Sequence, residues 1–291
     1  VHIFLFMKKT SKDTGLPSIT AVIIAKNEEN MIANCIDTLH WCDEIIVIDN
    51  DSSDATATIA ENAGARVVSF KSDDFSKKRE LGLKRTKTDW IFYIDADERV
   101  TPRLYQEIAV HLETNQSAAL RFRRENICYG TQLQYGGWED DYVTRVFKRE
   151  TLEGWTGEIH ESPVYEGLTT TLHTPLLHFT HRSTQDNLHK SAEWTYLEAE
   201  LLYEAGVEQV TFLTLLRKGG MEFIRRAYLK QGYKDGLAGM IEALVQGMNR
   251  IMVYIQVWEL QHKPPIQEVY HQKERELAQL WKQSFSEQKT R

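Results

Sequence analysis

The first hundred residues alternate short apolar runs with segments of helical spacing. Runs rich in β-branched and aromatic residues predict strands at 17–24, 44–48, 66–70 and 91–94. The segments between them predict helices at 30–39, 55–63 and 75–86. Regular alternation of strand and helix is typical of α/β proteins, so we expect a mostly parallel, doubly wound sheet with flanking helices.

Polar residues follow three of the predicted strands. The candidate site residues in these polar segments are Ala25, Asn27 and Glu28 after the first strand, Asp49, Asn50 and Asp51 after the second, and Asp95 and Asp97 after the fourth. The carboxyl ends of parallel strands share one edge of a sheet, where ligands of α/β proteins bind. If the backbone stays extended beyond the fourth strand, Asp95 and Asp97 point the same way. Two carboxylates favour Mg²⁺ or Mn²⁺ together with a diphosphate.

Composition and short motifs disfavour several classes of protein function. The chain has 291 residues, 26% of them charged, and its net charge of -7 argues against nucleic acid as a partner. Neither a GxGxxG nor a Walker A sequence occurs, which disfavours dinucleotide dehydrogenases and P-loop NTPases. Three cysteines without CxxC spacing indicate a reducing cytoplasm. Residues 1–16 are expected to be a disordered extension, and no charge-free apolar stretch is long enough to predict a membrane-spanning helix.

Three segments carry a resemblance to a known family: Ile24 to Glu29, Ile48 to Thr56, and the D-x-D segment Asp95 to Glu98. With them the chain resembles family 2 glycosyltransferases, which have the GT-A fold. Later segments resemble the bacterial lipopolysaccharide core β-1,4-glucosyltransferase branch, namely 136–138, 144–148, 154–161, 177–183 and 230–236.

This resemblance implies an inverting hexosyltransferase that moves a sugar, glucose in that branch, from a UDP-sugar to a lipopolysaccharide core, a glycolipid or another cell-surface glycan. The first two motifs would hold base and ribose, and the third the metal-bound diphosphate. Asn50 stands where many relatives carry Asp, which leaves the donor open. Two alternatives are a silent nucleotide-sugar-binding module and a nucleotidyltransferase. The latter normally needs a glycine-rich loop that Ala25 to Glu29 lacks.

The resemblance also implies roles for single residues. Glu161 is expected to be the general base, with Glu158 and Asp141 as rivals. Asp97 is expected to bind the cation directly, Asp95 to contact the metal or the ribose, and His160 to be either a further ligand or structural. Arg79 and Arg145 are candidate donor contacts, and Lys78 is a weaker one. His178 and His181 lack metal-ligand spacing and are expected to be structural.

The last third of the chain changes character. We expect a GT-A domain over 17–184 and a helical region over 185–291, with helices at 185–203, about 221–260 and 266–291. Basic residues near its apolar helices fit an anionic membrane surface. The alternative is a helical subdomain that packs on the GT-A core or on another subunit. We expect the protein to be cytoplasmic and, where it binds lipid, peripheral on the inner face of the cytoplasmic membrane. The oligomeric state is left open.

Overall fold

The structure is a computed structural model that describes residues 15–72, 74–157 and 161–289, without the side chains of 193 and 285–289. The chain divides into two compact units, Val1–Arg182 and Ser183–Arg291. Each unit has its own core, so each is described separately.

The first unit is built around one large mixed sheet. Its parallel part has the order β3 (Arg66–Ser69), β2 (Glu44–Asp49), β1 (Ile19–Ala25), β4 (Trp90–Asp95). The sheet continues through β8 (Tyr142–Lys148), β6 (Ala119–Cys128), β12 (Leu176–Phe179) and β5 (Glu98–Arg99). Strand β8 is antiparallel to both β4 and β6, whereas β12 is parallel to β6 and antiparallel to β5. Small strands β7 (Thr131–Gln132) and β11 (Thr169–Thr171) pair with β6, and β9 (Leu152–Thr156) pairs with β10 (Ser162–Tyr165).

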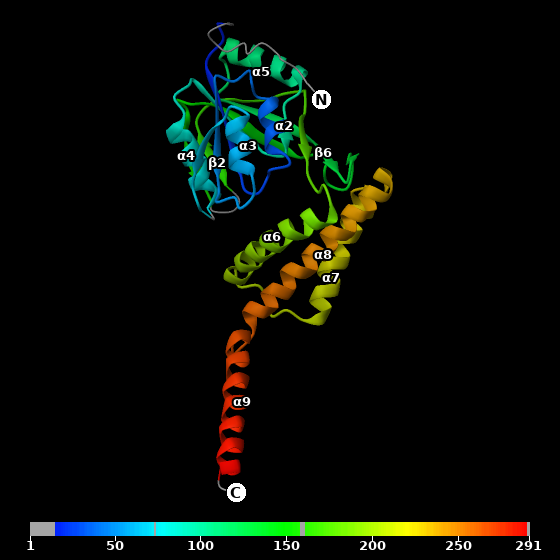
Figure 1. The fold of residues 1–291 in the computed structure, drawn as a ribbon. Helices are drawn as coiled ribbons and strands as arrows, with labels where there is room; N and C mark the ends of the chain where they lie inside the picture. The colour runs from blue at the N-terminus through cyan, green and yellow to red at the C-terminus, as the bar shows by residue number, and fades with distance from the viewer. Residues whose placement is uncertain (1–14, 73, 158–160, 290–291) are drawn as a thin grey trace. The chain divides into compact units, whose positions relative to one another are not determined.

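Helices flank this sheet (Figure 1). They are α2 (Ile32–Asp37), α3 (Thr56–Asn62), α4 (Phe75–Arg85) and α5 (Pro102–Thr114). The predicted mostly parallel sheet with flanking helices, as in a GT-A fold, is therefore confirmed. The predicted strands and helices differ from the observed ones only by a few residues at their ends, where hydrogen bonding frays.

The central strand β4 is buried on both faces, which explains its unbroken apolar run. On one face Phe92 stacks on Phe122, with ring centroids 6.1 Å apart. On the other, Tyr93 meets Trp155 edge-on at 5.0 Å. Helix α4 approaches this second face closely at Gly82, where an added Cβ would lie 2.6 Å from Cγ1 of Val22. The core thus holds the carboxyl end of β4 in place.

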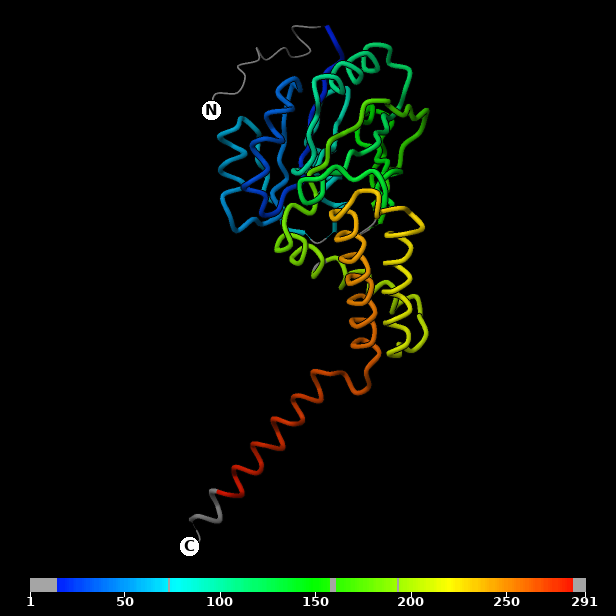
Figure 2. The backbone as a smooth tube through the Cα atoms, turned by 90° about the vertical axis from the view of Figure 1, so that its right-hand side faces the viewer, coloured from blue at the N-terminus to red at the C-terminus, as the bar shows by residue number. Residues whose placement is uncertain are grey.

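The second unit consists of α6 (Thr184–Glu204), α7 (Phe212–Ile224), α8 (Gly236–Gln261) and α9 (Ile266–Lys289). Helices α7 and α8 run side by side (Figures 1 and 2). The prediction of one helix over about 221–260 was wrong. A π-helical turn at Arg225–Leu229 and a 3-10 turn at Gly232–Asp235 separate α7 from α8, and Gln231 between them has a positive φ of 57°. Throughout the described ranges, none of the helices combines the length and the apolar character needed to cross a bilayer.

Candidate active site

Strand register brings the polar strand ends together. Ala25 at the end of β1 is paired with Asp49 at the end of β2, and Ile24 is paired with Asp95 at the end of β4. Three strand ends that lie far apart in the sequence are therefore adjacent at one edge of the sheet.

The loops after β1 and β2 are bonded to each other. The backbone nitrogen of Asn27 donates to Ser52 Oγ at 2.9 Å, and Asn27 Oδ1 accepts from the backbone nitrogen of Ser53 at 2.8 Å. The backbone nitrogen of Glu28 donates to Thr56 Oγ1 at 2.8 Å. Asn27 has a φ of 55°, a left-handed conformation that Asn tolerates better than most residues. These bonds make the two loops one preorganised surface.

The three polar residues at the end of β2, Asp49, Asn50 and Asp51, differ in whether their side chains already have partners. Asp51 is exposed and paired with Lys71 at 2.6 Å, and this hydrogen bond and charge lower the pKa of its carboxyl group. Asn50 Oδ1 accepts from the backbone nitrogen of Ser72 at 2.9 Å. Asp49 is buried, and its Oδ1 has no hydrogen-bond partner among the described residues. A buried acceptor without a partner is costly, so Asp49 Oδ1 fits a bound donor group.

Asp95 at the end of β4 faces two arginines. Arg145 Nη2 donates to Asp95 Oδ2, and Arg79 Nη2 lies 3.8 Å from Asp95 Oδ1. Burial raises the pKa of the Asp95 carboxyl, but the charges of Arg145 and Arg79 outweigh it, and the pKa lies below its usual value. Asp95 is therefore a carboxylate inside a cationic pocket.

Glu98 supports this pocket from inside the protein. Its side chain is fully buried, and its Oε2 accepts from the backbone nitrogen of Asp95 at 2.9 Å. Its Oε1 lies 2.9 Å from Arg145 Nη2 and 3.5 Å from Arg124 Nη1. Because a buried charge needs partners, Glu98 and the arginines hold one another in fixed positions.

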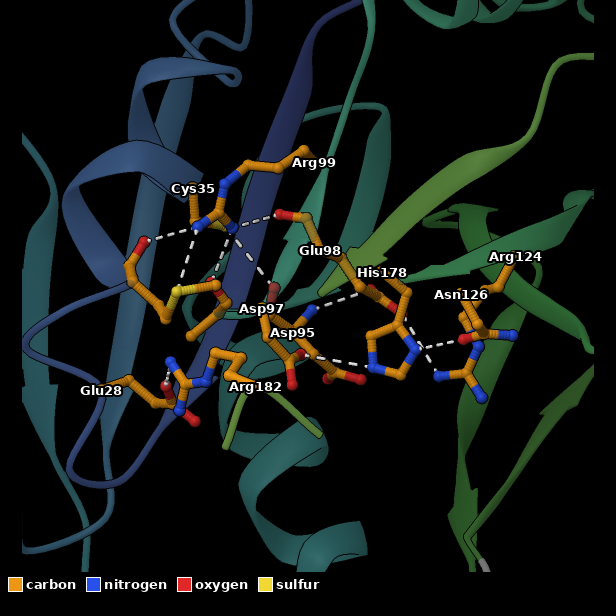
Figure 3. Close-up of polar contacts among 12 residues, drawn as sticks. Glu28, Cys35, Asp95, Asp97, Glu98, Arg99, Arg124, Asn126, His178 and Arg182 are labelled. Carbon is orange, nitrogen blue, oxygen red and sulfur yellow. Dashed lines mark hydrogen bonds and ion pairs between the residues drawn. The ribbon is translucent and has the colours of Figure 1, made fainter. Parts of the chain in front are cut away.

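Asp97 has a different partner. A turn at Ala96–Asp97 follows β4, so the extended continuation on which the expected common direction of the two carboxylates depended does not occur. Asp97 Oδ1 lies 3.6 Å from His178 Nε2 (Figure 3). On the other side of the ring, His178 Nδ1 lies 2.6 Å from Asn126 Oδ1. Asn126 Nδ2 in turn donates to Asp141 Oδ2 at 2.9 Å.

Glu161 lies at the same site. Arg79 Nε donates to Glu161 Oε1 at 2.8 Å, and Arg79 Nη2 forms an ion pair with the same oxygen at 2.8 Å. The guanidinium of Arg79 also packs over the Trp155 ring at 4.7 Å from its centroid. Arg79 therefore bridges Glu161 and Asp95.

The other predicted contributors are placed less favourably. Asp141 accepts two hydrogen bonds from Arg124, each at 2.9 Å, which ties up both carboxylate oxygens of this rival base. Lys78 is buried, with its Nζ 3.6 Å from the centre of the Phe75 ring. Glu158 and His160 lie outside the described residues. Within the part of the chain that the structure describes, no cluster of three acidic, histidine or cysteine side chains is arranged to hold a metal.

Comparisons with known proteins identify the family of this domain. The profile described as Glycosyl transferase family 2 matches residues 20–162, which include all three strand-end motifs and Glu161. Residues 20–162 belong to glycosyl transferase family 2. The protein is a glycosyltransferase, and the resemblance expected from its motifs is confirmed.

Individual relatives of this glycosyltransferase differ in their sequence identity to it and in the share of the chain that they cover. It is 25% identical to the lipopolysaccharide core biosynthesis glycosyltransferase LpsC of Rhizobium meliloti, over 83% of this chain and 92% of the relative. An uncharacterized glycosyltransferase of Rickettsia bellii is 36% identical over 36% of each chain. Among solved structures, mannosyl-3-phosphoglycerate synthase from Rubrobacter xylanophilus is 20% identical, with a TM-score of 0.45, over 69% of this chain and 79% of that one.

Some residues of the site of this glycosyltransferase were not predicted from its sequence motifs. Glu98, Arg124 and Asn126 contribute to the polar network but were given no role, and His178, which also contributes, was expected only to be structural. Glu98 is adjacent to the D-x-D segment, so its position was a usable signal. His178 reaches the site only because β12 pairs with β5, which opposes His178 and Glu98. Such a pairing between distant short strands leaves no local sequence pattern.

Proposed function

We propose that this glycosyltransferase transfers a hexose, with inversion, from a UDP-sugar to a lipopolysaccharide core, a glycolipid or another cell-surface glycan. The observation that carries the proposal is the meeting of Asp49, Asp95 and Asp97 at one sheet edge beside Arg79 and Arg145. Acidic groups that bind a cation, next to arginines that bind phosphate, suit a nucleoside diphosphate.

The donor would lie across the three strand ends. The unpartnered Oδ1 of Asp49 would accept a hydrogen bond from the base or ribose, next to the Asn27 and Asn50 loops. Arg145 and Arg79 would face the diphosphate. Asp97 would bind Mg²⁺ or Mn²⁺, and the acidic donor set at this edge fits such a hard cation. When bound, the cation would stabilise negative charge on the departing nucleoside diphosphate.

Glu161 is proposed as the general base. An inverting transfer needs one group that removes the proton from the acceptor hydroxyl as the hydroxyl attacks. In the structure Arg79 Nε donates to Glu161 Oε1, and Arg79 Nη2 lies at the same distance from that oxygen. A donor diphosphate would compete for Arg79 and so leave Glu161 Oε1 free to face the acceptor hydroxyl. Donor binding and base activation are thereby linked through one arginine.

A lipid-linked acceptor is proposed partly because the name of the relative LpsC refers to lipopolysaccharide core biosynthesis. The helical unit supports the same idea. Leu213 on α7 is 71% exposed and Leu237 at the start of α8 is 76% exposed. Arg217 and Lys218 lie on the same helix as Leu213. Apolar side chains next to basic ones fit the surface of an anionic membrane, where such an acceptor would be found.

A donor screen tests the proposal. Thermal shift and calorimetry with UDP, GDP, CMP and dTDP, each with Mn²⁺ and then with EDTA, should show stabilisation by UDP that EDTA abolishes. Stabilisation by another nucleotide would overturn the UDP assignment, and stabilisation that EDTA leaves intact would overturn metal dependence. Nucleotide binding without transfer across a broad panel of acceptors would favour a silent binding module.

A further inference from the structure

Arg99, the residue after the D-x-D segment, binds the turn at Ala96–Asp97 from inside the protein. Its side chain is buried, and its Nη1 donates to the carbonyl oxygen of Ala96 at 2.7 Å. A second bond from Nη1 reaches the carbonyl oxygen of Glu98 at 2.6 Å (Figure 3). On the other branch, Nη2 donates to the carbonyl oxygen of Met31 at 3.0 Å. Met31 is the N-cap residue of α2, so one guanidinium joins the turn to the start of that helix.

These contacts fix the backbone on both sides of Asp97. The peptide plane before its α-carbon contains the Ala96 carbonyl, which accepts from Arg99. The peptide plane after it contains the carbonyl of Asp97 itself, which accepts from the backbone nitrogen of Phe179 at 2.8 Å. Peptide units are rigid planes, so two held planes set the φ and ψ of Asp97. They thereby set the direction in which its side chain leaves the backbone.

The shape and charge of arginine suit this position. Its donors form a planar fork that serves several carbonyl oxygens at once, whereas lysine offers a single nitrogen. The guanidinium also packs over Phe179, with its central carbon 5.7 Å from the ring centroid. Burial lowers the pKa of Arg99, and the nearby charges of Asp97 and Glu28 act against this effect. A buried cation carries a desolvation cost, which natural sequences accept mainly at functional sites.

We propose that Arg99 is a positioning residue for the divalent cation, because it holds the turn of the D-x-D segment and so keeps the Asp97 carboxylate in place before the cation binds. This inference rests on the proposed function, which assigns the cation to Asp97. Arg99 is not expected to contact the cation or the donor, since its Nη1 and Nη2 are directed at backbone oxygens. A binding site is precise only when such supporting contacts fix the residues that bind.

Arg99→Lys tests the inference, because it keeps the charge and removes the fork. The full chain is titrated with Mn²⁺ in the presence of UDP, and the EPR signal of free Mn²⁺ gives the Kd. We expect this Kd to rise roughly tenfold, at the lower end of the effect of outer partners of a metal site. Because the defect lies in affinity for the cation, excess Mn²⁺ should restore kcat. Hydrogen exchange of the amides of residues 95–99 should become faster.

Two control variants separate positioning from general stability. Arg103→Lys makes the same chemical change at an exposed arginine in the first turn of α5, and it should change neither the Kd nor the exchange. Ile45→Val removes one methyl group from the buried start of β2, at the end of the strand opposite Asp49. It should lower the unfolding temperature but leave the Kd for Mn²⁺ unchanged.

The possible outcomes distinguish this inference from the proposed function. An unchanged Kd in Arg99→Lys, or an equal rise in Ile45→Val, would overturn the inference alone. A kcat that stays low in excess Mn²⁺ would also overturn it, since Arg99 would then act on something other than cation binding. If the natural protein binds UDP but no Mn²⁺, the metal assignment of the proposed function fails, and the inference fails with it.

Phe179→Leu decides the question if Arg99→Lys does not fold. This change keeps Arg99 and the backbone bond to Asp97, but it removes the ring over which the guanidinium packs. We expect a rise in the Kd for Mn²⁺ that is smaller than the tenfold rise expected of Arg99→Lys. A Kd equal to that of the natural protein would count against the positioning role.

Discussion

The strand-end site of the first unit and helix α8 of the second unit depart from simple folding rules in opposite ways. At the site, charged groups such as Glu98 and Arg145 are buried. Helix α8 instead keeps small residues such as Gly239, Ala243 and Gly247 inside. Five of its large apolar residues, all before Val253, are exposed in a stripe, namely Leu237, Ile241, Leu244, Met248 and Met252. Val253, Tyr254 and Val257 of the same helix are buried.

Neither arrangement is what stability alone would favour. Buried charges carry a desolvation cost, and an exposed apolar stripe gives up the free energy of burial. Natural sequences accept such costs mainly at functional sites. Both arrangements therefore support the proposals made above, donor chemistry at the strand ends and contact with another surface at the helices, and each proposal can be tested by variants that affect one region alone.

The largest effect is expected from Glu161→Gln. The amide cannot take the acceptor proton, and a general base typically contributes roughly 10²- to 10⁴-fold to the rate. We expect kcat to fall within this range while the Kd for UDP does not rise, because the amide competes less than the carboxylate for Arg79; UDP release and calorimetry measure the two quantities. Glu153→Gln, an exposed change on neighbouring strand β9, is the control and should leave kcat unchanged. An equal loss of kcat in both variants, or no loss of kcat in Glu161→Gln, would show that Glu161 is not the general base.

A slightly smaller effect is expected from Asp97→Asn. The change keeps the shape of the side chain but removes the charge that would hold the cation, and one electrostatic group of this kind contributes roughly 10²- to 10³-fold to kcat. The Kd for Mn²⁺ in the presence of UDP should rise as well. Asp37→Asn, on the exposed side of α2, is the matched control. Full donor turnover by Asp97→Asn in buffer that contains metal would refute the metal assignment.

The sequence predicted the parallel strands better than it predicted the site. The strand that ends at Asp95 was recognisable because its five apolar residues are buried on both faces and their chemistry alone indicates a strand. The turn at Asp97 was not recognisable, since Ala96 and Asp97 carry no strong turn signal. The contact between Asp97 and His178 depends on the pairing of β5 with β12, which short strands do not announce. The break at Gln231 was missed because Gly232 and Gly236 were not read as helix ends.

The helical unit can be tested by two neighbouring glycines of α7. A Cβ on Gly219 would lie 2.3 Å from Cγ1 of Ile251 and 3.1 Å from the carbonyl oxygen of Gly247, whereas a Cβ on Gly220 would meet nothing within 4 Å. Gly219→Ala and Gly220→Ala gain the same helix propensity, so their difference isolates the clash between α7 and α8. We expect Gly219→Ala to be less stable by roughly 1–3 kcal/mol.

Hydrogen exchange of the α7 and α8 amides in the full chain measures this difference without requiring a two-state transition. Faster exchange in Gly219→Ala than in Gly220→Ala is the expected result. Donor binding at the strand ends should be the same in both variants. Equal protection would show that α7 and α8 are not packed as closely as Gly219 indicates.

The smallest effect is expected at the proposed membrane surface, from Arg217→Gln. Arg217 is exposed on α7, and one basic side chain near an anionic lipid surface contributes about 1 kcal/mol, which corresponds to about fivefold in affinity. Sedimentation with vesicles that contain phosphatidylserine should show this loss, and salt should weaken binding of the natural protein because charge contributes to it. Lys87→Gln, an exposed change in the first unit, controls for net charge and should bind as the natural protein does. If the natural protein does not bind these vesicles, or binds neutral phosphatidylcholine equally well, the proposed anionic membrane surface is wrong, and we would expect the exposed stripe of α8 to bind a protein partner. Of the two proposals, only donor binding at the strand ends would then remain.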